Sequence, residues 1–369
     1  MQTSRVLVLG MAEGHGGAQT AFREFVNFLH EQGAEVAILI IRNNAAPVSW
    51  LRCATSWQVP LSANSIAEKL SKAFCVIRVA WFARKFAPDV FVSVGLAQTA
   101  NIVARVLPQS TFKIAQDFIF GRSAADPLLR SAEKVFDAIG VQTHTMATAL
   151  LNSGFRARPV NWLPCIPEAP IEGCFKQARQ KVESVQLAYF GRIVRHKGLH
   201  LVLEALANAE FSIPVTLDIW GIGEEIVRLR SQCDELRLSD QVAFCGAYPS
   251  GREGALLMCS YDAIIVPSTG CEGLPLILIE AMAYGLPYLA TDVGAISECC
   301  EGNPDSVLVQ PDVEALREGL IQLVDLVRGE GLSPERLRRF YDHRFSRSAM
   351  QQRWLECLNA PEAFFNVAK

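Results

Sequence analysis

The chain has 369 residues, of which half are apolar and a fifth are charged, an ordinary globular composition that excludes a disordered protein. This length is too great for one compact core, so two domains are expected. The net charge of −3 is uneven: residues 1–180 carry eighteen Lys and Arg against twelve Asp and Glu, whereas the remainder carries seventeen against twenty-six. The basic first part indicates an anionic partner, such as a membrane surface or a phosphorylated ligand, or else only solvated surface charge.

The start of the chain, MQTSRVLVLG, predicts a first strand over residues 5–9. Its apolar run is too short for a signal peptide, and no window of the chain reaches the roughly 18 continuous apolar residues that a membrane span requires. We therefore expect a cytoplasmic protein.

The first half alternates strands with helices. After the glycine-rich turn GMAEGHGG, apolar residues at Phe22, Phe25, Val26 and Leu29 have helical spacing and predict a helix over 18–32. The further predicted elements are a strand over 35–41, a helix over 66–86, a strand over 90–94, a helix from Thr99, and strands over 112–115 and 138–141. This alternation is typical of a parallel, doubly wound sheet.

Clustered prolines separate this series from a second one. Pro159, Pro164, Pro167 and Pro170 indicate a linker from Pro159 to about residue 180. The second series has predicted strands over 186–190, 215–220, 242–245, 263–266 and 288–290, and predicted helices over 199–209, 223–233 and 275–284. The expected fold class is α/β, with two Rossmann-like doubly wound domains facing across a cleft. Ligands of such sheets bind beyond the carboxyl ends of the strands.

The cysteines do not indicate disulfides or zinc. There are eleven, an odd number, Cys299 and Cys300 are adjacent, and no CxxC pair occurs. Scattered cysteines in a long chain fit a reducing cytosol.

The stretch CEGLPLILIEAMAYGLPYLATDVG, residues 271–294, places Glu272 and Glu280 in an otherwise almost wholly apolar run. It follows a predicted buried strand, and proline at 275 predicts the start of a helix whose free N–H groups attract phosphate. Carboxylates beside a phosphate site are suited to sugar or ribose hydroxyls. The alternative is a dipole partner for Glu272 and a buried salt bridge for Glu280.

Two more turns belong to the same predicted sheet edge. Gly191 and Arg192 follow one strand, and Lys197 stands at the start of the next helix, which makes an anion cradle. Gly221 and Gly223 form a further tight turn at a strand end. Three such turns in one domain predict a site for a nucleotide diphosphate.

These segments resemble a known family. FGRIVRHKG, WGIGEE and VPSTGCEGLPLILIEAMAYGLPYLATDVGAISE are similar to the donor-binding domain of glycosyltransferase family 4, which has the GT-B fold, over about residues 186–310. Glu272 and Glu280 match that family's E-x7-E motif. GHGGAQTAF, KFAPDVFVSVG and FSRSAMQQRW give a weaker likeness, the last of them to a C-terminal helix that returns to the first domain. The expected divisions are residues 1–165, a linker over 166–180, a donor-binding domain over 181–345, and the returning helix over 346–369.

The resemblance implies a retaining glycosyltransferase that moves a sugar from a UDP- or GDP-sugar to an acceptor hydroxyl, in surface polysaccharide or glycolipid synthesis or on a small soluble acceptor. It implies that Arg192 and Lys197 neutralise the leaving diphosphate, that Glu272 holds the donor sugar, and that Glu280 holds the ribose. The other implied donor-binding residues are Gly16, Gly17, Gly191, Gly221, Gly223, Gly273, Leu274, Pro275 and Leu276. Fixed cations would meet charge that grows as the bond breaks.

The chain departs from the family in places. Gln116 and Asp117 stand where many relatives have a histidine, and they are the candidates for a further contact with the donor sugar. Leu274 and Pro275 replace a common Phe-Gly pair. No D-x-D sequence occurs, so neither a metal nor another cofactor is expected.

Other functions compete with this interpretation. An NAD(P) oxidoreductase is disfavoured, because the first turn lacks G-x-G-x-x-G and the second strand ends at Arg42 without an acid. A non-catalytic sugar-nucleotide-binding protein and a GT-B epimerase are further alternatives. The expected partners are the nucleotide sugar and a glycan, lipid-linked or small-molecule acceptor, and no nucleic acid. The segment AEKLSKAFCVIRVAWFARKF, residues 67–86, has the composition of an interfacial amphipathic helix. It predicts weak association with an anionic membrane, at the inner face of the cell membrane. The alternative is an ordinary helix packed on the sheet.

Overall fold

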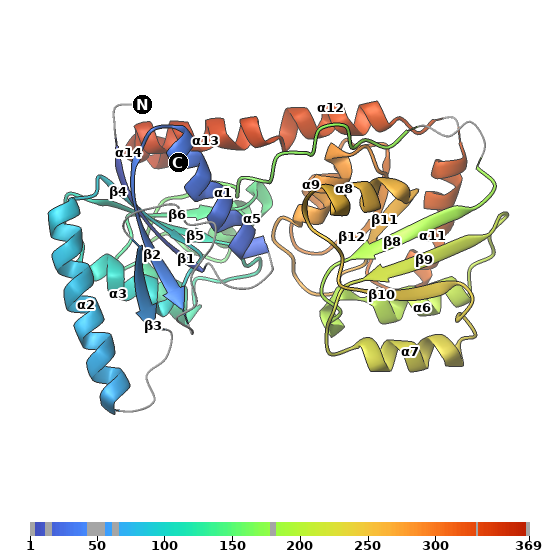
Figure 1. Ribbon diagram of the computed structural model, residues 1–369, viewed down its shortest axis with the longest axis horizontal. Coiled ribbons are helices and arrows are strands. Elements are labelled where there is room, and N and C mark those ends of the chain that lie inside the picture. The colour runs from blue at the N-terminus through green and yellow to red at the C-terminus, as the bar shows by residue number, and fades with distance from the viewer. Residues whose placement is uncertain are drawn as a thin grey trace. The chain divides into compact units, whose positions relative to one another are not determined.

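The computed structural model describes residues 4–11, 17–42, 56–60, 66–177, 182–329 and 331–366. The chain divides into two compact units (Figure 1). The first unit is Met1–Glu168 together with Arg347–Lys369, and the second is Ala169–Ser346.

A seven-stranded parallel sheet forms the centre of the first unit. Its strand order is β3-β2-β1-β4-β5-β6-β7. The strands are β1 (Arg5–Met11), β2 (Glu35–Arg42), β3 (Ser56–Pro60), β4 (Val90–Val94), β5 (Phe112–Asp117), β6 (Ala138–Val141) and β7 (Val160–Trp162). All five residues of β4 are buried. Such continuous burial is expected where helices cover both faces of a parallel sheet.

Seven helices accompany this sheet in the described residues. They are α1 (Gly17–Glu31), α2 (Ile66–Phe86), α3 (Gln98–Val106), α4 (Pro127–Ala132), α5 (His144–Asn152), α13 (Arg347–Asn359) and α14 (Pro361–Asn366). The predicted return of the C-terminal helix is confirmed, because Trp354 of α13 is buried and its Nε1 donates to the carbonyl oxygen of Pro164 at 2.7 Å. The Trp354 ring lies 4.2 Å from that of Phe25 in α1.

The second unit has a six-stranded parallel sheet of order β10-β9-β8-β11-β12-β13. The strands are β8 (Val185–Phe190), β9 (Val215–Trp220), β10 (Val242–Gly246), β11 (Ala263–Val266), β12 (Tyr288–Thr291) and β13 (Ser306–Val309). The helices are the 3-10 helix η1 (Arg195–Lys197), α6 (Leu199–Ala207), α7 (Ile226–Glu235), α8 (Gly251–Ser260), α9 (Leu276–Ala283), α10 (Ser297–Cys300), α11 (Val313–Arg328) and α12 (Pro334–Arg344). The predicted fold class of two doubly wound α/β domains is therefore confirmed.

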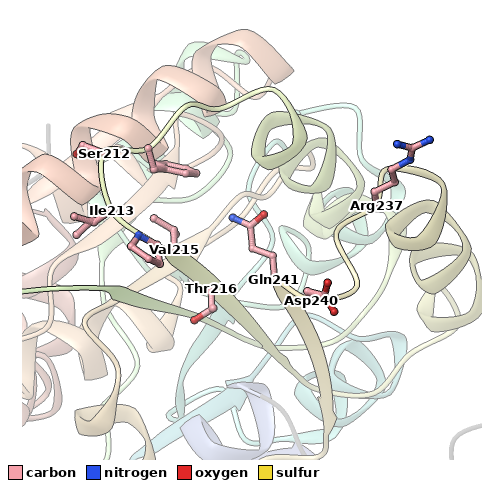
Figure 2. A pocket seen from close by; sticks show the side chains of 9 residues that line it. Ser212, Ile213, Val215, Thr216, Arg237, Asp240 and Gln241 are labelled. Atoms are coloured by element: carbon pink, nitrogen blue, oxygen red, sulfur yellow. The ribbon is translucent and has the colours of Figure 1, made fainter.

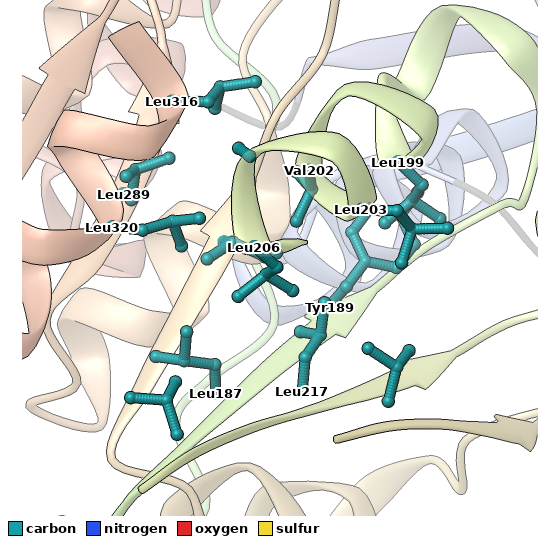
Figure 3. Close-up of a cluster of buried hydrophobic side chains, with 14 of the residues drawn as sticks. Leu187, Tyr189, Leu199, Val202, Leu203, Leu206, Leu217, Leu289, Leu316 and Leu320 are labelled. Carbon is teal, nitrogen blue, oxygen red and sulfur yellow. The ribbon is translucent and has the colours of Figure 1, made fainter. Parts of the chain in front are cut away.

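Figure 3 shows the apolar core that fixes β8 and α6 in the second unit. Leu187 of β8, Leu203 of α6, Leu217 of β9 and Leu320 of α11 are completely buried in one cluster. Full burial of a side chain of this size contributes roughly 1.5–3 kcal/mol. The turn between β8 and α6 is thus held at both ends by well-packed elements.

The segment predicted as a linker is packed. Val160–Trp162, at its start, forms the edge strand β7. Farther along, the backbone N–H of Ile171 donates to the hydroxyl of Tyr284, and the Lys176 amine lies 3.0 Å from Oδ1 of Asp262. These contacts make the segment after Glu168 part of the second unit.

The described part of the chain gives no sign of a membrane span or of a metal cluster. None of its helices has both the length and the apolar character needed to cross a bilayer. Its nine characterised cysteines are free, and no group of three or more His, Cys, Asp and Glu residues lies in position to hold a metal ion among the residues described.

Candidate functional site

Two glycine turns at the carboxyl ends of β8 and β9 lie in backbone contact. The N–H of Ile193 donates to the carbonyl oxygen of Ile222 at 2.9 Å. Gly221 has a φ of +147°, and a Cβ there would lie 1.8 Å from the carbonyl oxygen of Gly191. Only glycine allows this approach, so the residue type at 221 brings the two turns together.

The turn after β8 also contacts the loop after β11. Gly198 follows η1 with a φ of +74°, and a Cβ there would lie 1.8 Å from the carbonyl oxygen of Pro267. The N–H of Thr269 donates to the carbonyl oxygen of His196 at 2.8 Å. The three predicted turns are therefore brought together at one edge of the sheet.

Lys197 and Glu272 form an ion pair where these loops meet. The Lys197 Nζ lies 2.5 Å from Oε1 of Glu272, and the two side chains are 19% and 17% exposed. Ser268, which is fully buried, donates its hydroxyl to the same Oε1 at 2.8 Å. Oε1 of Glu272 thus accepts from both a cation and a buried hydroxyl.

A hydrogen bond from Tyr189 fixes the backbone of Arg192. The Tyr189 hydroxyl donates to the carbonyl oxygen of Arg192 at 2.7 Å. Burial raises the pKa of this phenol well above its usual range, and the charge of Glu272 adds to the rise. Tyr189 therefore stays a neutral donor, and the side chain of Arg192 is left exposed above it.

Helix α9 begins at Leu276, one residue later than predicted. Pro275 is its N-cap in an extended conformation, with φ −76° and ψ 107°, and no side chain caps the helix. Gly273 and Leu274 lie half-buried in the preceding loop. Glu280 is half-buried in the helix, and its carbonyl oxygen accepts from the N–H of Tyr284. An N-terminus without a side-chain cap suits an anion.

The two donor-sugar candidates of the first unit, Gln116 and Asp117, are buried and bonded to neighbouring residues. Gln116 and Asp117 are each 2% exposed at the end of β5. The Gln116 amide donates to the carbonyl oxygen of Leu163, and Asp117 pairs with Arg122 at 3.0 Å. Burial raises the pKa of the Asp117 carboxyl, an effect that Arg122 opposes. Gly17 is the first residue of α1. Gly16 lies outside the described residues.

The sequence prediction missed three residues near the turns. Ser268 lies in a loop without any periodic signal. Ile222 and Tyr248 follow β9 and β10 and are 66% and 44% exposed. The Tyr248 ring stands edge-on to that of Phe190 at 5.5 Å. An isoleucine between two glycines at a strand end was a usable signal for an exposed apolar contact.

An open hollow of about 630 Å³ lies elsewhere in the second unit (Figure 2). Its walls include Ser212, Val215, Thr216 and Gln241. Val215 and Thr216 begin β9, so the hollow is at the amino ends of the strands. The candidate site is at their carboxyl ends, and the hollow takes no part in it.

Comparison with known proteins matches residues 172–337 to the family model described as glycosyl transferases group 1. A putative colanic acid biosynthesis glycosyltransferase, WcaL of Escherichia coli, is 31% identical over 185 residues, which is 48% of this chain and 45% of the relative. An exopolysaccharide phosphotransferase of Streptomyces coelicolor is 30% identical over 242 residues, or 64% of this chain and 25% of that protein. The chain thus spans less than half the length of these two relatives.

The similarity in fold to solved structures covers nearly the whole chain. The solved structure of Anabaena Alr3699/HepE in complex with UDP superposes with a TM-score of 0.78 at 17% identity, covering 96% of this chain and 100% of that one. At this identity the likeness establishes the fold alone. The whole chain therefore has the GT-B fold. The match of residues 172–337 to the group 1 glycosyl transferases, together with the relatives of that class, supports a glycosyltransferase.

Proposed function

We propose that the protein is a retaining glycosyltransferase of family 4, which transfers a sugar from a nucleotide-diphosphate sugar to an acceptor hydroxyl in polysaccharide or glycolipid synthesis. The observation that carries the proposal is the Lys197–Glu272 pair, 2.5 Å apart, where three strand-end loops meet. A cation and a carboxylate side by side suit a donor that joins an anionic diphosphate to a neutral sugar.

The comparisons support the class of substrate. The names of the two relatives refer to colanic acid and exopolysaccharide, and the structural neighbour was solved with UDP. We extend these features to the present chain as a nucleotide-sugar donor and a glycan or lipid-linked acceptor, with a small soluble acceptor as the alternative.

In the proposed reaction, the bond between the anomeric carbon and the diphosphate oxygen breaks. The acceptor oxygen forms the new bond on the same face, and its proton passes to the departing diphosphate. Negative charge grows on the departing diphosphate, so Arg192 and Lys197 act where that charge develops. The N-terminus of α9, which no side chain caps, adds backbone donors to the same group.

Donor binding would give Lys197 a second anionic partner. Glu272 would then direct its carboxylate to hydroxyls of the transferred sugar, while Ser268 keeps it in place from its buried position. Glu280 would hold the ribose hydroxyls. Each charge of the pair gains a substrate partner, so neither is left unpaired in the complex.

We further assign the exposed apolar side chains of Ile222 and Tyr248 to the nucleobase. Ile222 follows β9, the neighbour of β8, at the sheet edge that carries Lys197, and Tyr248 follows β10, the next strand along, and packs its ring against Phe190 of β8. A flat base gains contact area from such side chains, and this contact needs no hydrogen bond that distinguishes one base from another. This arrangement is compatible with UDP or GDP.

The reaction should need no divalent metal, because cationic side chains are placed to neutralise the diphosphate and the sequence has no D-x-D. The test is to incubate the purified protein with UDP- and GDP-sugars and candidate acceptors, with chelator or with magnesium, and to measure free nucleotide diphosphate and the anomeric configuration of the product. A glycosylated acceptor of retained configuration, formed in chelator, is expected. Inverted configuration or a strict need for magnesium would contradict the corresponding part of the proposal, and an epimerised sugar nucleotide would contradict transfer itself.

A further inference from the structure

One side of α2 in the first unit exposes large apolar side chains and cations together. Phe74, Ile77 and Trp81 are 61%, 65% and 60% exposed. They are spaced three and four residues apart, which places them on one side of the helix. Arg78 and Lys85 are exposed on the same side. We call Phe74, Ile77, Arg78, Trp81 and Lys85 the outer face of α2.

The outer face is not required for packing within the unit. Val79, Phe82 and Ala83 of α2 are buried on the opposite side. That side contacts α3 and β3, and α2 lies along the outside of the first unit (Figure 1). Three large apolar side chains on the other side therefore remain mostly exposed, although such residues are rarely grouped on a protein surface.

After Glu68 in its first turn, α2 carries charge of one sign only. Between Glu68 and Asp89 the sequence has Lys69, Lys72, Arg78, Arg84 and Lys85 and no acidic residue. The Arg78 guanidinium lies 6.0 Å from the centre of the Phe74 ring, and the Lys85 amine lies 5.6 Å from that of Trp81. The cations thus stand beside the aromatic rings, as they do on helices that lie in a membrane interface.

We propose that the outer face of α2 docks the first unit on an anionic lipid bilayer. The rings of Phe74 and Trp81 enter the headgroup region, and the cations contact lipid phosphates. Charge decides between this occupant and a second copy of the chain, because a symmetric dimer through the face would set cations against cations. The proposal stands on α2 alone and does not depend on the transfer reaction.

The test is flotation of the whole protein with vesicles of phosphatidylcholine alone and with added phosphatidylglycerol, at low and high salt. We expect binding only with phosphatidylglycerol, weakened at high salt by screening. Each surface cation contributes about fivefold to partitioning, so Arg78→Gln with Lys85→Gln should lower it about thirtyfold. Phe74→Ser with Trp81→Ser should lower it at least about tenfold.

The matched control is Val227→Ser with Leu256→Ser, which removes two apolar side chains that are 80% and 49% exposed in the second unit. It should leave vesicle binding unchanged. The proposal is overturned by equal binding to neutral vesicles, by no binding at low salt, or by a Phe74→Ser/Trp81→Ser variant that floats like the parent. Loss of a dimer in that variant, seen by light scattering without lipid, would assign the face to a second copy and also overturn it.

Discussion

A single pair of side chains, Lys197 and Glu272, balances the charge of the candidate donor site. Both are more than four-fifths covered, so solvent screens their attraction less than it would on the surface. Removing one partner would leave the other charge poorly solvated and unpaired. Substitutions at this site therefore have to be tested for folding before their effect on transfer is interpreted.

Substitution of the two motif glutamates should have different effects on nucleotide binding. Glu280→Gln should weaken both the sugar nucleotide and the free nucleotide diphosphate, because both contain ribose. Glu272→Gln should lower transfer while leaving the affinity for the free diphosphate nearly unchanged. Lys197→Ala should lower transition-state stabilisation by roughly 2–4 kcal/mol, more than it lowers donor binding.

Calorimetry with the free diphosphate and steady-state kinetics check these expectations. Arg228→Ala, an exposed change on α7, is the control and should affect neither measurement. If Glu272→Gln abolished diphosphate binding and Glu280→Gln preserved it, the two roles would have to be exchanged.

Ser268→Ala tests whether the buried hydroxyl positions Glu272. Loss of a hydrogen bond to a charged group costs roughly 1.5–3 kcal/mol, so the transfer rate should fall at least about tenfold. The affinity for free diphosphate should change little, since the hydroxyl contacts Glu272 and not the cation. Ser260→Ala, on an exposed serine at the end of α8, should leave kcat unchanged. Equal losses in kcat and in diphosphate affinity would indicate general damage to the loop instead.

Sequence patterns could place these residues on one sheet edge but could not pair them. Glycines and cations at strand ends predicted that Lys197 and the Glu272 loop would meet. The carboxylate oxygen that the Lys197 amine contacts depends on the loop conformation. The positive φ of Gly198 and its close approach to Pro267 set that conformation. The partner of Asp117 was missed for the same reason, because Arg122 reaches it through an irregular loop.

At the scale of elements, the three strands that the sequence did not predict, β3, β7 and β13, all lie at the edge of a sheet. β3 and β7 are the two edges of the first sheet, and β13 is an edge of the second. An edge strand is hydrogen-bonded on one side only and carries polar residues, as in the β7 sequence VNW. Central strands such as β4 were predicted because burial on both faces gives a continuous apolar run. Of the four edge strands in the two described sheets only β10 was predicted, so pattern alone identifies the centre of a parallel sheet better than its borders.

A buried ion pair anchors the segment that enters the second unit. Asp262, 1% exposed, accepts from the Lys176 amine and from the N–H of Gln186 in β8. Asp262→Asn should lower the free energy of unfolding by about 3–5 kcal/mol, because it leaves a buried cation without its counter-charge. Urea denaturation of the full chain measures this, with the surface change Asp240→Asn as control. A loss below about 1 kcal/mol would mean that the backbone contacts of this segment suffice to hold it.

For the whole molecule, the two ends of the chain build one unit. Residues 347–369 belong with residues 1–168, so the second unit is inserted between two parts of the first. Arg347 at the start of α13 lies 2.5 Å from Oε2 of Glu24 in α1. Arg353 donates to the carbonyl oxygen of Trp162 in β7. The last helices therefore contribute contacts to the first unit, although they follow α1 by more than 300 residues.

Trp354→Ala tests this dependence. The side chain is 1% exposed, packs on Phe25 and donates to Pro164, so its loss should lower the stability of the first unit by roughly 3–5 kcal/mol. Hydrogen exchange should then rise in α1 and β7, which lie about 190 residues or more before the substitution, and stay unchanged in the second unit from β8 to β13. Trp81→Ala is a matched control, because it removes the same side chain from a site in the same unit that is 60% exposed. Deprotection confined to α13 and α14 would show that the C-terminal helices are attached to the first unit without stabilising it, and the account of the chain as one inserted fold would then fail.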